Sequence, residues 1–173
     1  MDYEIAGLPL HVLLVHAVVV LVPLLALLLV VIAAWPGARR VLWLPALIGA
    51  AVLLPLGLVT IEAGKWLQVR VPPAPLIQEH TAIGESILPW LVALLVLAAV
   101  IAAWAVVELL SARRVARDEP ARPGRGIRIW VGAVLTLAAV VIAIGSTWTL
   151  VLIAEAGSRA VREGTVSDVP LED

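Results

Sequence analysis

The fold is decided by a long apolar stretch near the start of the chain, LHVLLVHAVVVLVPLLALLLVVIAA at residues 10–34. A helix rises about 1.5 Å per residue, so this stretch is long enough to cross the ~30 Å hydrocarbon core of a bilayer. Three more apolar stretches follow, at about residues 43–61, 87–110 and 129–153. Barrel strands are excluded, because they are about 10 residues long and alternate polar with apolar side chains. The sequence therefore predicts one all-α domain over residues 1–173, a transmembrane four-helix bundle.

The composition supports a membrane protein and excludes several kinds of site. Hydrophobic residues make up 62% of the chain and charged residues only 14%, whereas a soluble domain carries about 25% charged residues. The absence of cysteine excludes disulfides, iron–sulfur clusters and covalently attached c-type haem. A net charge of −1, with no basic tail, indicates no nucleic-acid partner. The lipid bilayer is the expected surrounding, and the bias toward Ala, Val, Leu and Arg is typical of a high-GC bacterial genome.

The basic residues predict the orientation of the helices. Eight of the 12 lie in two predicted loops, at 35–42 and 111–128: Arg39, Arg40, Arg113, Arg114, Arg117, Arg122, Arg125 and Arg128. Because loops rich in Lys and Arg stay in the cytoplasm, both loops are expected there. The predicted loop at 62–86 and both termini are then extracytoplasmic.

Similar segments recur along the chain. At an offset of 69, the segment Ile32-Ala33-Ala34-Trp35 recurs at 101–104, His11 falls on His80, and His16 falls on Glu85. At an offset of 93, Glu62-Ala63-Gly64 recurs at 155–157. These matches predict a duplicated helical hairpin whose parallel repeats are related by a pseudo-twofold axis along the membrane normal.

Such an axis would gather six polar residues at the outer end of the bundle: His11, His16, His80, Glu62, Glu85 and Glu155. His16 lies about one turn inside the apolar boundary, where an ionisable side chain is a candidate for function. Its alternative role is a neutral imidazole that hydrogen-bonds another helix. His11 and His16 are five positions apart and point about 140° away from each other, so they are not expected to bind the same ion.

The glutamates have a simpler alternative role as exposed carboxylates. Glu62 and Glu155 would then pair with Lys65 or Arg159. The glycine that follows each Glu-Ala pair is expected to let a neighbouring backbone approach closely. Glu108, at the inner end of the third span, is predicted to be an interface residue near Arg113 and Arg114.

Hydrolytic chemistry is poorly supported by the sequence. The chain contains no nucleotide-binding glycine motif, no zincin motif and no Gly-x-Ser-x-Gly motif. Ser86, Ser146 and Thr147 lack an evident base. The protein is therefore less expected to be an enzyme than a binding or structural protein.

Three functions remain open. The first is non-covalent haem b binding or electron transfer through His11, His16 and His80, with an extracytoplasmic redox or membrane-protein partner. The second is a divalent metal site, for zinc, manganese or iron, in which these histidines act with Glu62, Glu85 and Glu155. The third is a structural or accessory subunit without a cofactor. Haem binding ranks slightly above a bare metal ion.

The stretch Gly7-Leu8-Pro9-Leu10-His11-Val12-Leu13-Leu14-Val15-His16-Ala17, followed by Pro23, resembles the start of the bacterial membrane family known as domain of unknown function 2231. The His80-x-x-x-Gly84-Glu85 segment and the two Glu-Ala-Gly segments are similar to that family as well. Val12 stands where many members have proline, and Ala17 where many have an aromatic residue. The resemblance implies four helices and favours His11, His16 and His80 as the site, and it supplies no activity.

Overall fold

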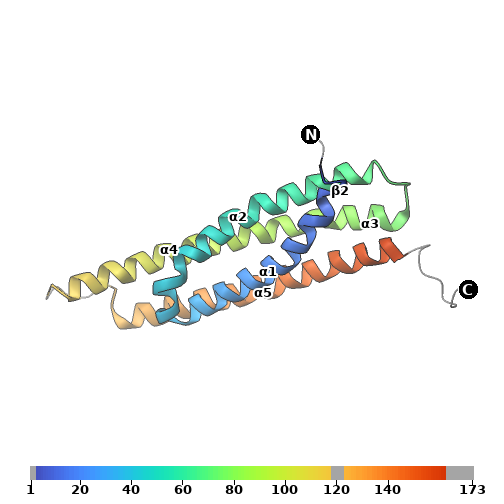
Figure 1. Ribbon diagram of the computed structural model, residues 1–173. Helices are drawn as coiled ribbons and strands as arrows, with labels where there is room; N and C mark the ends of the chain where they lie inside the picture. Colours follow the sequence, from blue (N-terminus) through green and yellow to red (C-terminus); the bar gives the residue numbers. More distant parts are fainter. Residues whose placement is uncertain (1–2, 118–122, 163–173) are drawn as a thin grey trace, which may run out of the picture.

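The computed structural model describes residues 3–117 and 123–162 (Figure 1). Its elements in chain order are β1 (Glu4–Ile5), β2 (Leu8–Pro9), α1 (Leu10–Ala34), α2 (Pro36–Gln68), α3 (Pro75–Gly84), a short 3-10 turn η1 (Glu85–Ile87), α4 (Leu88–Val115) and α5 (Arg125–Arg162). Four helical segments are long and apolar enough to cross a membrane, with α3, η1 and α4 counting as one. The prediction of an all-α bundle with four helices long and apolar enough to span a membrane is confirmed.

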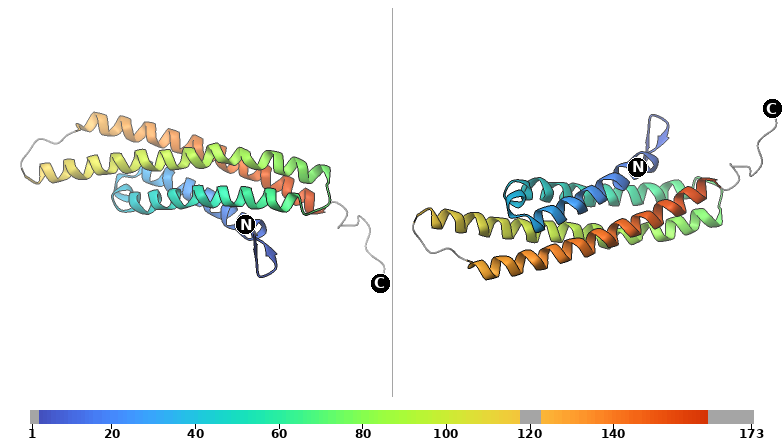
Figure 2. Two further views of the ribbon diagram at one scale, coloured as in Figure 1. Left: turned by 90° about the horizontal axis from the view of Figure 1, so that it is seen from above. Right: turned by 90° about the horizontal axis from the view of Figure 1, so that it is seen from below.

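The four long helices lie side by side, and each contacts two neighbours closely. Helix α1 packs against α2 and α5, and α4 packs against the same two helices (Figures 1 and 2). The short helix α3 continues the line of α4 and packs against the last turns of α5. α1 and α4 therefore occupy opposite corners of the bundle.

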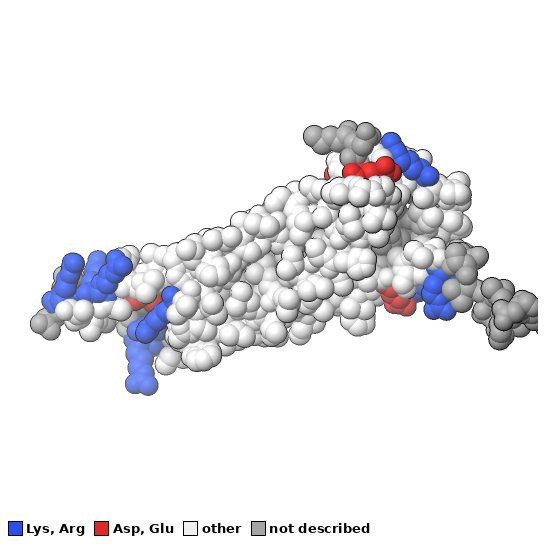
Figure 3. All heavy atoms as spheres, viewed as in Figure 1, with Lys and Arg blue, Asp and Glu red and all other residues white. Residues whose placement is uncertain are grey.

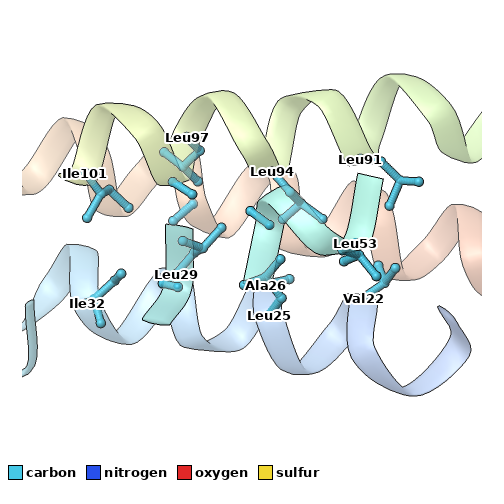
Figure 4. Packing of buried hydrophobic residues seen from close by; sticks show 14 of the residues in the cluster. Val22, Leu25, Ala26, Leu29, Ile32, Leu53, Leu91, Leu94, Leu97 and Ile101 are labelled. Atoms are coloured by element: carbon cyan, nitrogen blue, oxygen red, sulfur yellow. The ribbon is translucent and has the colours of Figure 1, made fainter. Parts of the chain in front are cut away.

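The core lies between these opposite corners. Side chains of α1 and α4 point toward one another in Figure 4, among them Leu29 and Ile32 of α1 and Leu94 and Ile101 of α4. Ile32 and Ile101 have no exposed surface. Interiors packed this closely leave few voids, so each core side chain fixes the position of its neighbours.

The outside of the bundle is apolar along most of its length, as expected of a surface that contacts lipid. Leu137 and Ile144 of α5, for example, are 68% and 66% exposed. On the face drawn in Figure 3, the middle of the bundle carries no charged side chains, and charged side chains lie at both ends. We call the end where α1 turns into α2 the arginine-rich end, because Arg40, Arg113 and Arg125 lie there. We call the opposite end, where His11 and His80 lie, the histidine end.

The helices extend beyond the predicted spans, into residues that the sequence assigned to loops. Residues 36–42 of the loop expected at 35–42 are helical, and only Trp35 separates α1 from α2. Pro36 starts α2 at a position where its missing N–H is not needed. The loop expected at 62–86 contains the last turns of α2 and all of α3, and α5 extends beyond 129–153 at both ends. Hydropathy detects only the apolar part of a helix. The polar turns at its ends remain helical but give no hydropathy signal.

A small β-hairpin precedes α1 and was not predicted. Its turn residues Ala6 and Gly7 have φ angles of 53° and 77°, as a two-residue hairpin turn of this hand requires. The Tyr3 ring lies edge-on to Trp66 near the end of α2, with centroids 6.3 Å apart. The hairpin thus links the start of α1 to the end of α2, next to His11.

Candidate functional site

Two of the three histidines meet at the histidine end of the bundle. His11 is the second residue of α1, and His80 lies in α3. Their ring centroids are 6.1 Å apart, and the ring planes make an angle of 72°. Both rings are partly buried. The sequence matched these two residues at an offset of 69 and grouped them with His16 as candidate site residues.

Each ring is held by a hydrogen bond to the backbone of another helix. The Nδ1 of His11 lies 2.9 Å from the carbonyl oxygen of Thr60 in α2, and the Nδ1 of His80 lies 3.1 Å from that of Ile153 in α5. A carbonyl oxygen can only accept, so each Nδ1 carries the proton and donates it. In the neutral form of each ring, the free lone pair is then on Nε2. Histidines that bind metals have this arrangement, in which the second nitrogen donates to a carbonyl and fixes the tautomer.

Glycine makes room for both rings. Gly64 follows Thr60 by one turn, and a Cβ built on it would lie 2.9 Å from Nδ1 of His11. Gly157 follows Ile153 by one turn, and a Cβ there would lie 3.0 Å from Cε1 of His80. Both distances are shorter than ordinary side-chain contacts, so any larger residue would push the ring away. The two Glu-Ala-Gly segments therefore allow a histidine ring to approach, where the sequence predicted a neighbouring backbone.

The glutamates of these segments point to other partners. Lys65 bridges Glu62 and Glu85 at 3.0 and 2.8 Å, and Arg159 pairs with Glu155 at 2.7 Å. The three carboxylate side chains are 53–59% exposed. Over residues 3–117 and 123–162, no group of three or more His, Asp or Glu residues is arranged to hold a metal ion. The structure thus gives Glu62 and Glu155 the salt bridges named as their alternative role and does not bring them together with the histidines.

His16 lies apart from the histidine pair. It is exposed on α1, and its Nδ1 donates to the carbonyl oxygen of Val12 in the same helix, at 2.7 Å. His16 was the histidine considered most informative in the sequence. It does not join the pair formed by His11 and His80.

The bundle also contains a buried ion pair that the sequence did not predict. Arg39 in α2 is 1% exposed and Glu108 in α4 is 4% exposed. The Arg39 guanidinium donates to both carboxylate oxygens of Glu108, at 2.9 and 3.0 Å. The expectation that Arg39 is a loop residue and Glu108 an interface residue near Arg113 and Arg114 is wrong, because α2 already begins at Pro36 and carries Arg39 into the bundle.

Arg39 also caps α1. Its Nη1 donates to the carbonyl oxygens of Ile32 and Ala33, at 2.9 and 2.8 Å. The helical partner of Ile32 would be residue 36, and Pro36 has no N–H, so this carbonyl needs another donor. One signal could have identified the pair: residues 39 and 108 are separated by the same 69 positions as the sequence matches.

A groove opens beside this ion pair, at the arginine-rich end. It lies between the last residues of α1 and the first half of α5, and its volume is about 1000 Å³. Arg39, Glu108, Arg125 and Arg128 line its polar end. Arg128 lies 3.6 Å from Glu108.

Comparison of the chain with protein-family models, curated proteins and solved structures finds no match. The geometry of its own residues is therefore the basis for assigning a function.

Proposed function

We propose that His11 and His80 bind one non-covalent haem b and that the protein transfers electrons at the extracytoplasmic side of a membrane. The observation that carries this proposal is the pair of imidazoles whose Nδ1 atoms are tied to backbone carbonyls of two further helices. This leaves two Nε2 atoms, on separate elements of the chain, as nitrogen ligands.

The number of ligands favours haem over a bare ion. A divalent ion such as zinc takes four ligands in a structural site. The structure brings two imidazoles together without a carboxylate among the described residues. Haem iron receives four nitrogens from its macrocycle and needs only axial ligands from the protein. With both histidines holding the iron, no open position would remain for a substrate, which favours electron transfer over catalysis.

The two rings lie close enough together that His11 and His80 would both hold one haem iron. The centroids of His11 and His80 are 6.1 Å apart.

We further infer that the chain is a duplicated hairpin with parallel, pseudo-twofold repeats. The acceptors of the two histidines, Thr60 and Ile153, differ by the same 93 positions as the two Glu-Ala-Gly segments. The buried residues support the same offsets. At an offset of 69, Val18, Val22, Leu25, Leu29 and Ile32 fall on Ile87, Leu91, Leu94, Ala98 and Ile101, all of which are buried. At an offset of 93, Ala46, Thr60 and Ala63 fall on the buried residues Ala139, Ile153 and Ala156.

The orientation is proposed from charge. Figure 3 shows Lys and Arg without a matching number of acidic side chains at the arginine-rich end, and mixed charges at the histidine end. By the positive-inside rule, the arginine-rich end is cytoplasmic, and both termini are extracytoplasmic. The haem would then exchange electrons with an extracytoplasmic or membrane-bound partner. The resemblance of the His11 and His80 segments to the bacterial family domain of unknown function 2231 is in keeping with this proposal.

An absorbance spectrum tests the proposed function. The protein is expressed with a haem precursor, purified in mild detergent and measured in the oxidised and reduced states. A Soret band that shifts on reduction is expected. His11→Ala and His80→Ala should each remove or weaken it, whereas His16→Ala should retain it, because His16 does not belong to the pair.

The other outcomes separate the remaining functions. Elemental analysis of the same sample detects a bare metal ion. A stoichiometric metal without a Soret band would indicate a divalent metal site in place of the proposed haem site. If the folded protein shows neither a Soret band nor a stoichiometric metal, the remaining function is a cofactor-free accessory subunit.

A further inference from the structure

The groove at the arginine-rich end follows helix α5 over several turns. Its α5 wall runs from Arg125 to Val140, which is about 22 Å at 1.5 Å per residue. This exceeds half of the ~30 Å hydrocarbon core. A volume of about 1000 Å³ is large enough for a small-molecule ligand.

The walls of the groove change from polar to apolar along its length. Beyond Arg128 the α5 wall continues through Gly132, Ala133, Leu137 and Val140. Successive positions in this series are one, four and three residues apart, which places them along one face of the helix. Thr136 lies on the same face, and its hydroxyl donates to the carbonyl of Gly132 at 2.8 Å, so it presents little free polar surface.

The polar end of the groove carries excess positive charge. Among residues 3–117 and 123–162, Arg39, Arg125 and Arg128 line it together with one carboxylate, that of Glu108. Arg39 already satisfies this carboxylate with two hydrogen bonds. Arg128 lies 3.6 Å from it, and its side chain is 36% exposed. Arg125 is exposed as well. Arg125 and Arg128 are thus available to an anion, and guanidinium groups pair well with phosphate oxygens.

We propose that this groove binds one anionic phospholipid, with its phosphodiester on Arg125 and Arg128 and one acyl chain along the α5 wall toward Val140. Charge and shape together select this occupant. A soluble anion would leave the apolar wall uncovered, and a neutral lipid would leave the excess positive charge unpaired. Basic pockets between membrane helices bind acidic headgroups in this way. The proposal does not depend on the histidine pair.

Gly132 allows a test of the groove itself. A Cβ built on Gly132 meets no protein atom within 4 Å. Gly132→Leu therefore starts its side chain in open space at the wall of the groove. It should displace the acyl chain and leave the fold and any haem spectrum unchanged.

The experiment measures retained lipid. The full chain is reconstituted in nanodiscs that contain phosphatidylglycerol and phosphatidylcholine in equal amounts, extracted into mild detergent, and analysed by native mass spectrometry. The unmodified protein should retain one phosphatidylglycerol per chain. Arg125→Gln/Arg128→Gln should weaken retention about 30-fold, since each arginine near an acidic headgroup contributes about a factor of 5. Gly132→Leu should reduce it to a similar extent.

The matched control is Arg113→Gln/Arg114→Gln. These residues lie in the last turn of α4 at the same end, outside the groove, and the variant loses the same charge. It should retain lipid as the unmodified protein does. Equal loss in this control, retention of phosphatidylcholine equal to phosphatidylglycerol, or full retention by a folded Gly132→Leu variant would each overturn the proposal. If the Arg125/Arg128 variant fails to fold, Gly132→Leu alone decides.

Discussion

Arg39 and Glu108 form a two-pronged salt bridge inside the bundle, with both side chains 2% exposed. The pair joins α2 to α4, and the remaining guanidinium nitrogen holds the last carbonyls of α1. One side chain therefore connects three of the four long helices. Removing a single partner of a buried pair leaves an uncompensated charge, which is strongly unfavourable.

We expect Glu108→Gln to destabilise the protein by about 3–5 kcal/mol, because the Arg39 charge would remain buried without a carboxylate. The measurement is chemical or thermal unfolding in detergent, with circular dichroism as the signal that records the transition. Arg128 lies 3.6 Å from Glu108 and is too exposed to compensate. A change below about 1 kcal/mol, the size typical of surface pairs, would contradict a structural role for this ion pair.

The double variant Arg39→Met/Glu108→Leu should recover only part of this loss. It removes both charges, but the carbonyls of Ile32 and Ala33 lose their donor. An unsatisfied buried acceptor costs about 1–3 kcal/mol. A swap of the two residues, Arg39→Glu/Glu108→Arg, should recover less, because a carboxylate would then face those carbonyls. Full recovery by the swap would show that charge pairing alone matters.

Gly145 and Gly132, both in α5, should respond oppositely to the same substitution. A Cβ on Gly145 would overlap the ring of Trp90, whereas a Cβ on Gly132 meets open space. Alanine improves helix propensity by about 1 kcal/mol at either position. We therefore expect Gly132→Ala to leave stability unchanged or raised, and Gly145→Ala to lower it by about 1–3 kcal/mol through overpacking. Unfolding of both variants under identical conditions provides the comparison.

The fold was largely predictable because a bilayer requires long apolar helices, and these are visible without knowing their partners. The sequence also placed His11 and His80 at the same end of the bundle, from an offset of 69 between two similar segments, but it did not single them out from His16. Helix ends were less predictable. Polar terminal turns such as those around Arg39 lack an apolar signature, so the sequence placed them in loops.

The Arg39–Glu108 pair was harder to recognise, although its two residues are also 69 positions apart. Each residue has an ordinary alternative near a membrane surface, and only the packing of α2 against α4 brings them together. The Glu-Ala-Gly segments show a similar difficulty. The charged Glu62 is the residue that suggests a function in the sequence. The contact with His11, however, depends on Gly64, whose missing side chain leaves room for the ring.

Gly64→Ala tests whether the close approach of His11 matters for its ligand role. The new Cβ would lie 2.9 Å from Nδ1 of His11, so the ring must move and its hydrogen bond to Thr60 must weaken. We expect the Soret band of the haem-loaded protein to weaken or shift. Gly49→Ala is the matched control in the same helix, because its Cβ would make an ordinary 3.6 Å contact with Leu25. If the two variants have identical spectra, Gly64 is not needed for haem binding by His11.

The proposed orientation can be tested cleanly because the chain contains no cysteine. A single cysteine is introduced at Val69, which is 77% exposed after the end of α2, or at Ala116, which is exposed just after α4. With both termini extracytoplasmic, a membrane-impermeant maleimide should label Val69→Cys in intact cells and Ala116→Cys only after lysis. The unmodified protein is the blank in both assays. The reverse pattern would place the histidine pair on the cytoplasmic side, and the proposed electron-transfer partner would then have to be sought there.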